Sequence, residues 1–410
     1  MILSINKTYC WIFIIAFILL VPSIYLLKFI DELMVLVMMC LVALDVVVNH
    51  NYKKYKFIFA VTGIMMLYFF YSFTLPYNTP KAIVYDFIAQ LKPFFYFGVA
   101  YAVAPKLDNI QKKVLKIVCI FNGILMMMLF VTELYKVVFY HVSYIGLVSF
   151  MSFMIYLLIS VKEDGTVLRK DIIISVIILT VGLTCTRSKF YGEYIMALYM
   201  LFWYRPGMLK KIKLSHILIF LGIVVLIFVA AWEKIDYYFI SGGQEDAIFD
   251  EDLVESFARP MLYAGMVLIL MMHPILGSGL GSFATHASSS NVNYSRIYTE
   301  IGLDNVWGLS PDFGAFICDA FYPSLAQFGL IGIILFIGFF VWNYKRLGLV
   351  LEKYGKIEYS LGILAIVVVL IESIAATTFS QGTGGICLMI MGYIISQVKG
   401  VKRMKLINEK

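Results

Sequence analysis

Apolar runs of about twenty residues recur along this chain of 410 residues, and they constrain its fold more than any other feature. Each run is long enough to cross a hydrocarbon core of about 30 Å as an α-helix. Hydrophobic residues make up 61% of the chain and charged residues 14%, and the mean hydropathy is +0.88, which lies far outside the range of soluble domains. A transmembrane β-barrel would show short alternating segments instead. The sequence therefore predicts an all-α polytopic membrane protein.

The runs predict about twelve spans in a single integral membrane domain over residues 1–410. They cover residues 9–27, 29–48, 57–75, 85–104, 114–132, 143–161, 172–185, 190–204, 215–231, 316–341, 359–376 and 386–397. The first run follows Lys7, as it would in a signal peptide, but it is too long for that role and no small-residue cleavage site follows it. We expect it to be a retained helix.

Lysine and arginine are distributed unequally between alternate links. If the N-terminus is cytoplasmic, the inner links hold 23 of the 33 cations and the outer links hold eight. Cytoplasmic links of membrane proteins carry such an excess. We therefore predict that both termini are cytoplasmic and that the long segment 232–315 is an external loop. The same distribution explains the net charge of +7 without a nucleic-acid partner.

The external loop contains an apolar stretch of its own, residues 261–272. It is too short to cross a bilayer as a helix, and crossing would move the later basic links outside, so we predict a re-entrant or interfacial helix. Pro260 suits its first turn, and Arg259 at the positive end of the helix dipole gives a candidate anion site. The alternative for Arg259 is a salt bridge to the acids at 251, 252 or 255.

A second candidate anion site is the short outer turn Thr186-Arg187-Ser188-Lys189. Its two cations either snorkel to the membrane surface or clamp an anionic lipid headgroup, with the planar fork of Arg187 on a phosphate. Arg296 is the third external arginine and a further candidate for substrate binding.

Asp319 is the candidate general base, because partial desolvation at the membrane surface would raise its pKa. The alternative is a carboxylate placed to favour a helix N-terminus. His286 is a secondary candidate base. Tyr294 and Tyr322 are candidates for stacking on sugars, although an aromatic belt at the membrane surface also accounts for Tyr322.

The glycine run Gly277–Gly281 partly fits a dinucleotide fingerprint, but no strand precedes it, so we predict a tight turn. The six cysteines show no zinc spacing, and only Cys185 and Cys318 lie where a disulfide is chemically possible. No pattern predicts a metal or a cofactor. Charged residues inside the runs, among them Asp86, Lys92 and Glu372, are expected to face protein or water.

Three stretches of the chain resemble the O-antigen polymerase and O-antigen ligase superfamily of bacterial envelope proteins. They are TCTRSKFYGEYIMALYML (184–201), ARPMLYAGMVLILMMHPILGSGLGSF (258–283) and CDAFYPSLAQFGLIGIILF (318–336), and QLKPFFYF (90–97) is a weaker fourth. About twelve spans with one large external loop also agree with the layout of that family. The sequence departs from the ligase pattern at Cys318-Asp319, where ligases carry a histidine, so the polymerase branch is favoured.

This resemblance implies glycan transfer from an undecaprenyl-diphosphate carrier on the periplasmic face of the bacterial inner membrane. Arg187 and Arg259 would then hold the diphosphate, and Asp319 would act as the base in place of the histidine. The partners implied are the lipid-linked glycan, the lipid bilayer and a chain-length regulator. An O-antigen ligase acting on lipid A core and a flippase for lipid-linked oligosaccharide are the alternatives. The long external loop counts against transport.

Overall fold

The structure is a computed structural model. It describes residues 4–205 apart from 25, 28, 140 and 163, the single residues 222, 225, 229 and 232, and residues 258–400. Every regular element within these ranges is a helix, which confirms the predicted all-α class. Most of the predicted span 215–231 and the whole acidic cluster at 245–255 lie outside the described residues.

Helices follow one another closely in the first described range. They are α1 (Ile5–Ile18), α2 (Leu20–Ser23), α3 (Ile30–Asn49), η1 (Tyr52–Tyr55), α4 (Lys56–Ser72), α5 (Pro80–Val103), α6 (Asn109–Val131), α7 (Tyr135–Val138), α8 (Ser143–Ser160), α9 (Arg169–Val181), η2 (Gly182–Cys185), α10 (Ser188–Leu198) and η3 (Tyr199–Trp203). The second range contains α13 (Ala258–Met272), η7 (His286–Ser288), α14 (Ile297–Glu300), η8 (Tyr322–Phe328), α15 (Gly329–Lys353), α16 (Lys356–Glu372), η9 (Thr378–Ser380) and α17 (Gly382–Ser396).

Four helical segments of the described chain are long and apolar enough to cross a membrane. They are Tyr52–Ser72, Asn109–Val131, Ser143–Ser160 and Tyr322–Lys353. Their outer faces carry large exposed apolar side chains such as Leu67, Val131 and Ile334. Water does not favour so much exposed apolar surface, whereas lipid does. The chain is therefore a helical membrane protein, and its number of spans and their direction stay predictions.

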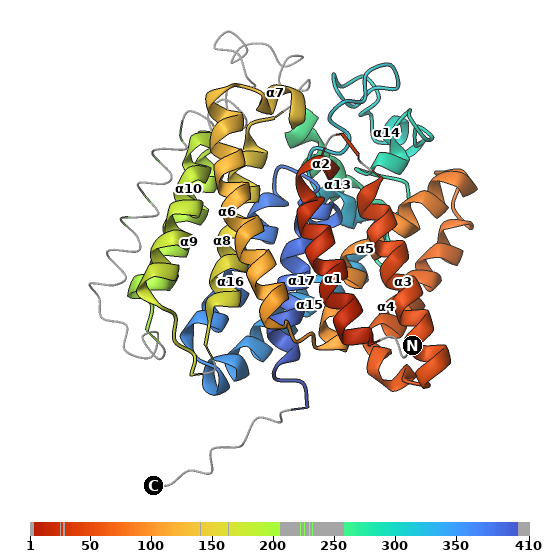
Figure 1. The fold of residues 1–410 in the computed structure, drawn as a ribbon. Helices are drawn as coiled ribbons and strands as arrows, with labels where there is room; N and C mark the ends of the chain where they lie inside the picture. Colours follow the sequence, from red (N-terminus) through yellow and green to blue (C-terminus); the bar gives the residue numbers. More distant parts are fainter. Residues whose placement is uncertain are drawn as a thin grey trace, which may run out of the picture.

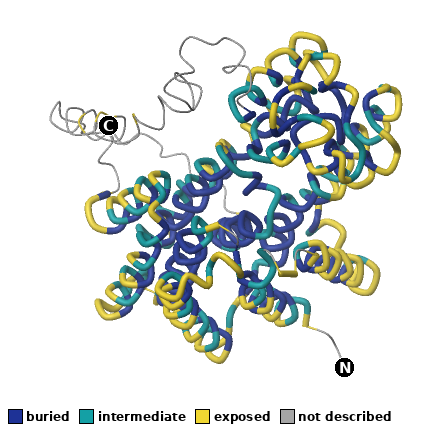
Figure 2. Tube along the Cα trace, turned by 90° about the horizontal axis from the view of Figure 1, so that it is seen from above, coloured by how far each residue is buried: buried dark blue, intermediate teal, exposed yellow. Residues whose placement is uncertain are grey.

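The helices run side by side as a bundle (Figure 1). Short α7 and α14 lie at one end of it, and the last turns of α17 lie at the other. Seen along the bundle, buried residues occupy its centre and exposed residues face outward on the peripheral helices (Figure 2). The loop that contains α14 forms a lobe with a small apolar core of its own, which includes Leu262, Phe283 and Tyr298.

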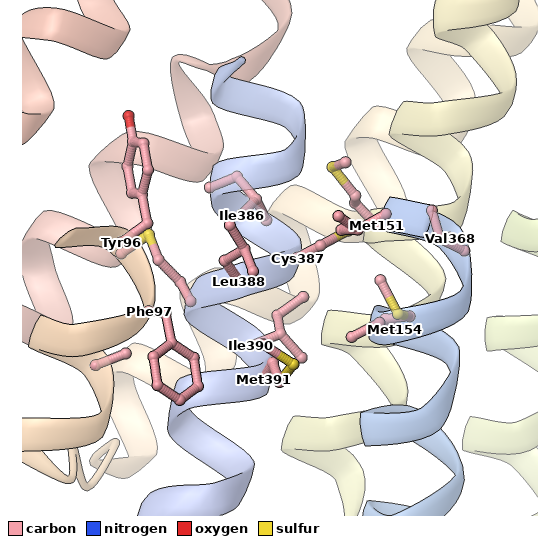
Figure 3. Close-up of a cluster of buried hydrophobic side chains, with 14 of the residues drawn as sticks. Tyr96, Phe97, Met151, Met154, Val368, Ile386, Cys387, Leu388, Ile390 and Met391 are labelled. Carbon is pink, nitrogen blue, oxygen red and sulfur yellow. The ribbon is translucent and has the colours of Figure 1, made fainter. Parts of the chain in front are cut away.

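Helix α17 is the central element of the bundle. It packs against α5 through Tyr96 and Phe97 and against α8 through Met151 and Met154, while Val368 approaches it from α16 (Figure 3). Its own side chains in this core are Ile386, Cys387, Leu388, Ile390 and Met391, all buried. A helix that is apolar on every side suits such a central position, where each face packs against another helix.

Residues 316–341, which the sequence predicts as one span, form two different structures. Residues 316–321 are irregular, η8 is a 3₁₀ helix that begins beside Pro323, and α15 begins at Gly329 and continues to Lys353. Gly329 adopts a positive φ of 60°, which separates η8 from α15. The helical segment that contains most of this predicted span therefore runs from Tyr322 to Lys353, and Asp319 precedes it.

The glycine run forms the tight turn that the sequence predicts. Gly277, Gly279 and Gly281 all have a positive φ, between 73° and 82°. The amides of this turn donate to protein oxygens, with Leu280 N bonded to Ser72 Oγ at 2.7 Å and Gly281 N to Asp86 Oδ2 at 2.8 Å. Because α4 and α5 provide these acceptors, the turn fixes the end of α13 against the bundle.

Candidate functional site

The C-terminal end of α16 is the place where the predicted site residues meet. Tyr263 on α13 donates its hydroxyl to Ile374 O at 2.7 Å, and Phe321 N donates to Ser373 O at 3.1 Å. Glu372, the last residue of α16, binds Lys189 at the start of α10. Three segments that are far apart in the sequence are thereby joined at one point.

Arg259 lies in the first turn of α13, as the sequence predicts, and forms an ion pair with Asp319. The acids at 251, 252 and 255, predicted as alternative partners, lie outside the described residues. Both members of the pair are about one quarter exposed, at 26% and 28% for the side chains. The candidate phosphate-binding cation and the candidate base are thus within reach of a ligand and are bonded to each other.

Two opposing effects act on Asp319. Burial raises the pKa of its carboxyl above the ordinary value, and this effect exceeds the lowering caused by the charge and hydrogen bond of Arg259 and by the charge of Lys189. A raised pKa suits a group that must take a proton near neutral pH. The charge of Lys189 contributes to the pKa of Asp319, so Lys189 lies within electrostatic range of it. The two predicted cation sites therefore belong to one cluster.

Arg187 binds His141, which lies in the link before α8. Burial first, and then the charges of Arg187 and Lys189, lower the pKa of His141. The Nε2 atom of the ring accepts the Arg187 hydrogen bond, and Nδ1 lies 2.6 Å from Ser143 Oγ and 3.2 Å from Ser143 N. Arg187 is therefore a held cation and not a freely snorkelling one. No pattern in the sequence points to His141, although it lies in a predicted outer link and is one of only five histidines.

An apolar groove lies between α4, α5 and the segment that follows Asp319. It has a volume of about 560 Å³. Val61 and Met65 on α4, Phe94 on α5 and Phe336 on α15 are among its lining side chains, and so is Phe321. Phe321 is two residues from Asp319 in the chain, so one lining residue of the groove lies near the candidate base.

The other two polar candidates lie within the lobe. Arg296 forms an ion pair with Glu300 at 3.7 Å on the short helix α14, and its side chain is 69% exposed. His286 is exposed in η7. The contacts that join the charged cluster involve neither of them. A direct role in binding substrate stays a prediction for both residues.

The two candidate tyrosines each hold part of the fold together. Tyr294 donates its hydroxyl to Leu309 O at 2.8 Å and stacks on Tyr298 at 5.3 Å between ring centroids. Tyr322 donates to Leu370 O at 2.6 Å. More open to solvent is Trp307, 60% exposed and 4.9 Å from Phe313 between ring centroids. Stacking on sugars stays a prediction for the tyrosines.

Several other charged and sulfur-bearing residues have structural contacts. Lys92 pairs with Asp31 at 2.7 Å and with Glu32 at 2.8 Å, which ties α5 to the start of α3. All six cysteines lie within the described residues and are free, so Cys185 and Cys318 form no disulfide.

Comparison with known proteins gives no match: no protein-family model fits the sequence, and no curated protein is significantly similar to it. The family resemblance of the three motifs therefore stays an expectation from the sequence. Any proposal of function must rest on the geometry at the end of α16.

Proposed function

We propose that this protein is a polymerase of the inner membrane that joins undecaprenyl-diphosphate-linked oligosaccharide repeat units into O-antigen or capsular polysaccharide. The observation that carries the proposal is the cluster at the end of α16. It holds Arg259, Lys189 and Asp319 within mutual electrostatic range, with an apolar groove beside them. A lipid-linked diphosphate needs both cations and an apolar channel.

The groove and the cluster match the two parts of such a donor. An isoprenoid chain is apolar and flexible, and the groove of about 560 Å³ offers an aromatic and aliphatic lining in which it can pack. The diphosphate would then lie beyond Phe321, where Arg259 offers a planar fork and Lys189 a point charge. Arg187, held by His141, provides a further fixed cation at the start of α10.

In the proposed reaction a sugar hydroxyl of one repeat unit attacks the anomeric carbon of a second lipid-linked glycan. A new C–O bond forms, the bond from the anomeric carbon to the phosphate oxygen breaks, and undecaprenyl diphosphate leaves. Asp319 accepts the hydroxyl proton, and the cations stabilise the charge that develops on the diphosphate. Before it can do so, Asp319 must exchange its bond with Arg259 for one with the acceptor, while the diphosphate takes its place on Arg259.

Deletion of the gene tests the proposal. A cell that lacks a polymerase still attaches single repeat units to lipid A core, so its lipopolysaccharide should lose the ladder of long chains and keep the one-unit band. Loss of all attached antigen with accumulation of lipid-linked polymer would identify a ligase and overturn the proposal. Accumulation of repeat units on the cytoplasmic side would identify a flippase.

A further inference from the structure

Behind Lys189 lies a pair of buried carboxyl groups to which the proposed reaction gives no role. Glu193 is 0% exposed, and it lies one helical turn after Lys189 on α10. Both of its carboxyl oxygens are buried, and within the described part of the chain no donor contacts either of them. The polar group close enough to share a hydrogen bond with Glu193 is the carboxyl of Glu372, which Lys189 also binds.

Two carboxylates cannot hydrogen-bond to each other unless one of them carries a proton. Burying an unpaired carboxylate is unfavourable, and a like charge beside it adds to that cost. One shared proton removes both penalties, because the pair then carries a single negative charge that Lys189 balances. A proton shared between Glu193 and Glu372 is therefore the arrangement that these contacts favour.

The other titratable groups around the pair do not supply a competing charge. Tyr144 on α8, Cys185 in η2 and Cys387 on α17 face it, and all three side chains are neutral at neutral pH. Two further charges act on this region: Arg187 acts on Cys185, and Asp319 interacts with Lys189. Lys189 is thus the cation shared between the buried pair and the open part of the site.

We propose that Glu193 and Glu372 form a proton-holding pair that couples the binding of a lipid phosphate at Lys189 to the uptake of one proton. When the phosphate draws Lys189 away, the pair loses its balancing cation and takes a proton from water. The resting COOH and COO⁻ become two COOH groups, and the proton returns to water when the phosphate leaves. The two glutamates are positioning residues for Lys189. This inference rests on the proposed function only for the choice of a phosphate-bearing lipid as ligand.

Calorimetry can count the protons. Purified full-length protein in detergent would be titrated with farnesyl diphosphoglucose, whose diester phosphates keep their charge across the neutral range, in two buffers of different ionisation enthalpy. We expect the wild type to take up about one proton per ligand through the pair. The double variant Glu193→Gln/Glu372→Gln should lose this uptake, whereas Asp319→Asn should keep it.

Several outcomes would overturn the proposal. If the heat of binding does not depend on the buffer, no proton is taken up. If Asp319→Asn abolishes the uptake and the double variant retains it, the proton goes to Asp319. If the probe does not bind at all, lipid phosphate binding at Lys189 is refuted, and with it the proposed coupling to proton uptake.

Infrared spectroscopy provides a second measurement that needs no ligand and no active variant. The resting wild type should show the carbonyl stretch of a buried carboxylic acid, and Glu193→Gln should remove or shift it. If that band is absent, the shared proton does not exist. Polymer synthesis without proton uptake would refute this inference alone, and proton-coupled binding without polymer synthesis would refute the proposed function alone.

Discussion

Arg259 on α13 is bonded to Asp319, which lies 60 residues later in the chain. The pair joins the residue predicted to hold the diphosphate to the residue predicted to remove the proton. In the absence of substrate each one satisfies the charge of the other. A diphosphate that displaces the carboxylate from Arg259 would free the base at the moment when the donor is in place.

Replacing Arg259 by alanine should abolish polymer synthesis. Loss of one charged group that stabilises the departing diphosphate is expected to lower the rate by about 10²- to 10³-fold. The measurement is ladder formation from synthetic lipid-linked repeat units by purified protein. Lys136→Ala is the matched control, because Lys136 forms an exposed pair with Glu133 and its loss should leave the rate unchanged. An active Arg259→Ala protein would refute the diphosphate clamp.

Replacing Asp319 by asparagine should separate binding from chemistry. The amide keeps the shape of the carboxyl but takes no proton, so turnover should fall by about 10²- to 10⁴-fold. Binding of the lipid diphosphate should stay equal or become tighter, because Arg259 no longer has a competing carboxylate. Turnover by this variant close to that of the wild type would exclude Asp319 as the base.

The rate should also depend on pH through Asp319. A base works only in its deprotonated form, so the rate should rise with pH as Asp319 loses its proton. Because burial raises the pKa of this carboxyl, the midpoint of the rise should lie above the ordinary range of an aspartate. Single-turnover rates across the acidic and neutral range measure it. A rise with its midpoint at or below that of a free aspartate would contradict the assignment.

Gly277→Ala should destabilise the turn that fixes α13. Its φ is +73°, and an added Cβ would lie 2.2 Å from Ala326 O, a backbone atom that cannot move aside cheaply. We expect a loss of more than about 2 kcal/mol in the free energy of unfolding. Thermal unfolding in detergent measures this loss. Gly63→Ala is the control: nothing lies within 4 Å of its added Cβ, and alanine favours a helix. Equal melting temperatures for the two variants would show that the turn does not need glycine.

Asp45→Ala should destabilise the other end of the bundle. Asp45 is buried and accepts hydrogen bonds from Tyr55 Oη at 2.6 Å and from Lys54 Nζ at 3.0 Å, besides those from two asparagine side chains. Its removal leaves these donors unsatisfied, at a cost of about 2–3 kcal/mol. The exposed Glu133→Ala should cost far less. Unfolding midpoints that coincide for the two variants would contradict this account.

The sequence predicted the local features of the site and missed their partners. The apolar stretch after Pro260 predicts α13, and closely spaced glycines predict the turn, because both signals depend on neighbouring residues. The bonds of Arg187 to His141 and of Lys189 to Glu372 join residues 46 and 183 positions apart, and only the packing of the bundle creates them. The predicted span 316–341 differs from the helical segment Tyr322–Lys353, because apolar composition does not locate the residues at which a helix begins and ends.

The partners of Lys92 also could not be predicted from the sequence, because they lie far from it in the chain. Along the chain its nearest intramembrane acid is Asp86, six residues away, and the two do not pair. Instead Lys92 reaches the start of α3, and the Asp86 carboxyl accepts the amide of Gly281. An isolated charge within an apolar run shows that a partner exists, but the identity of that partner depends on which helices become neighbours.

The two ends of the loop that carries α14 are fastened to each other. Ser278 N donates to Ala326 O at 3.3 Å, Gly279 N to Gln327 O at 3.0 Å, and Leu330 N to Pro274 O at 2.8 Å. The chain between them therefore starts and ends at one closed neck, and it carries Asp319. It also touches the bundle elsewhere, since Arg296 N donates to Tyr77 O and Phe321 N donates to Ser373 O. Related chains could vary this segment in length only at positions that keep these anchors, because the anchors also set where the candidate base stands.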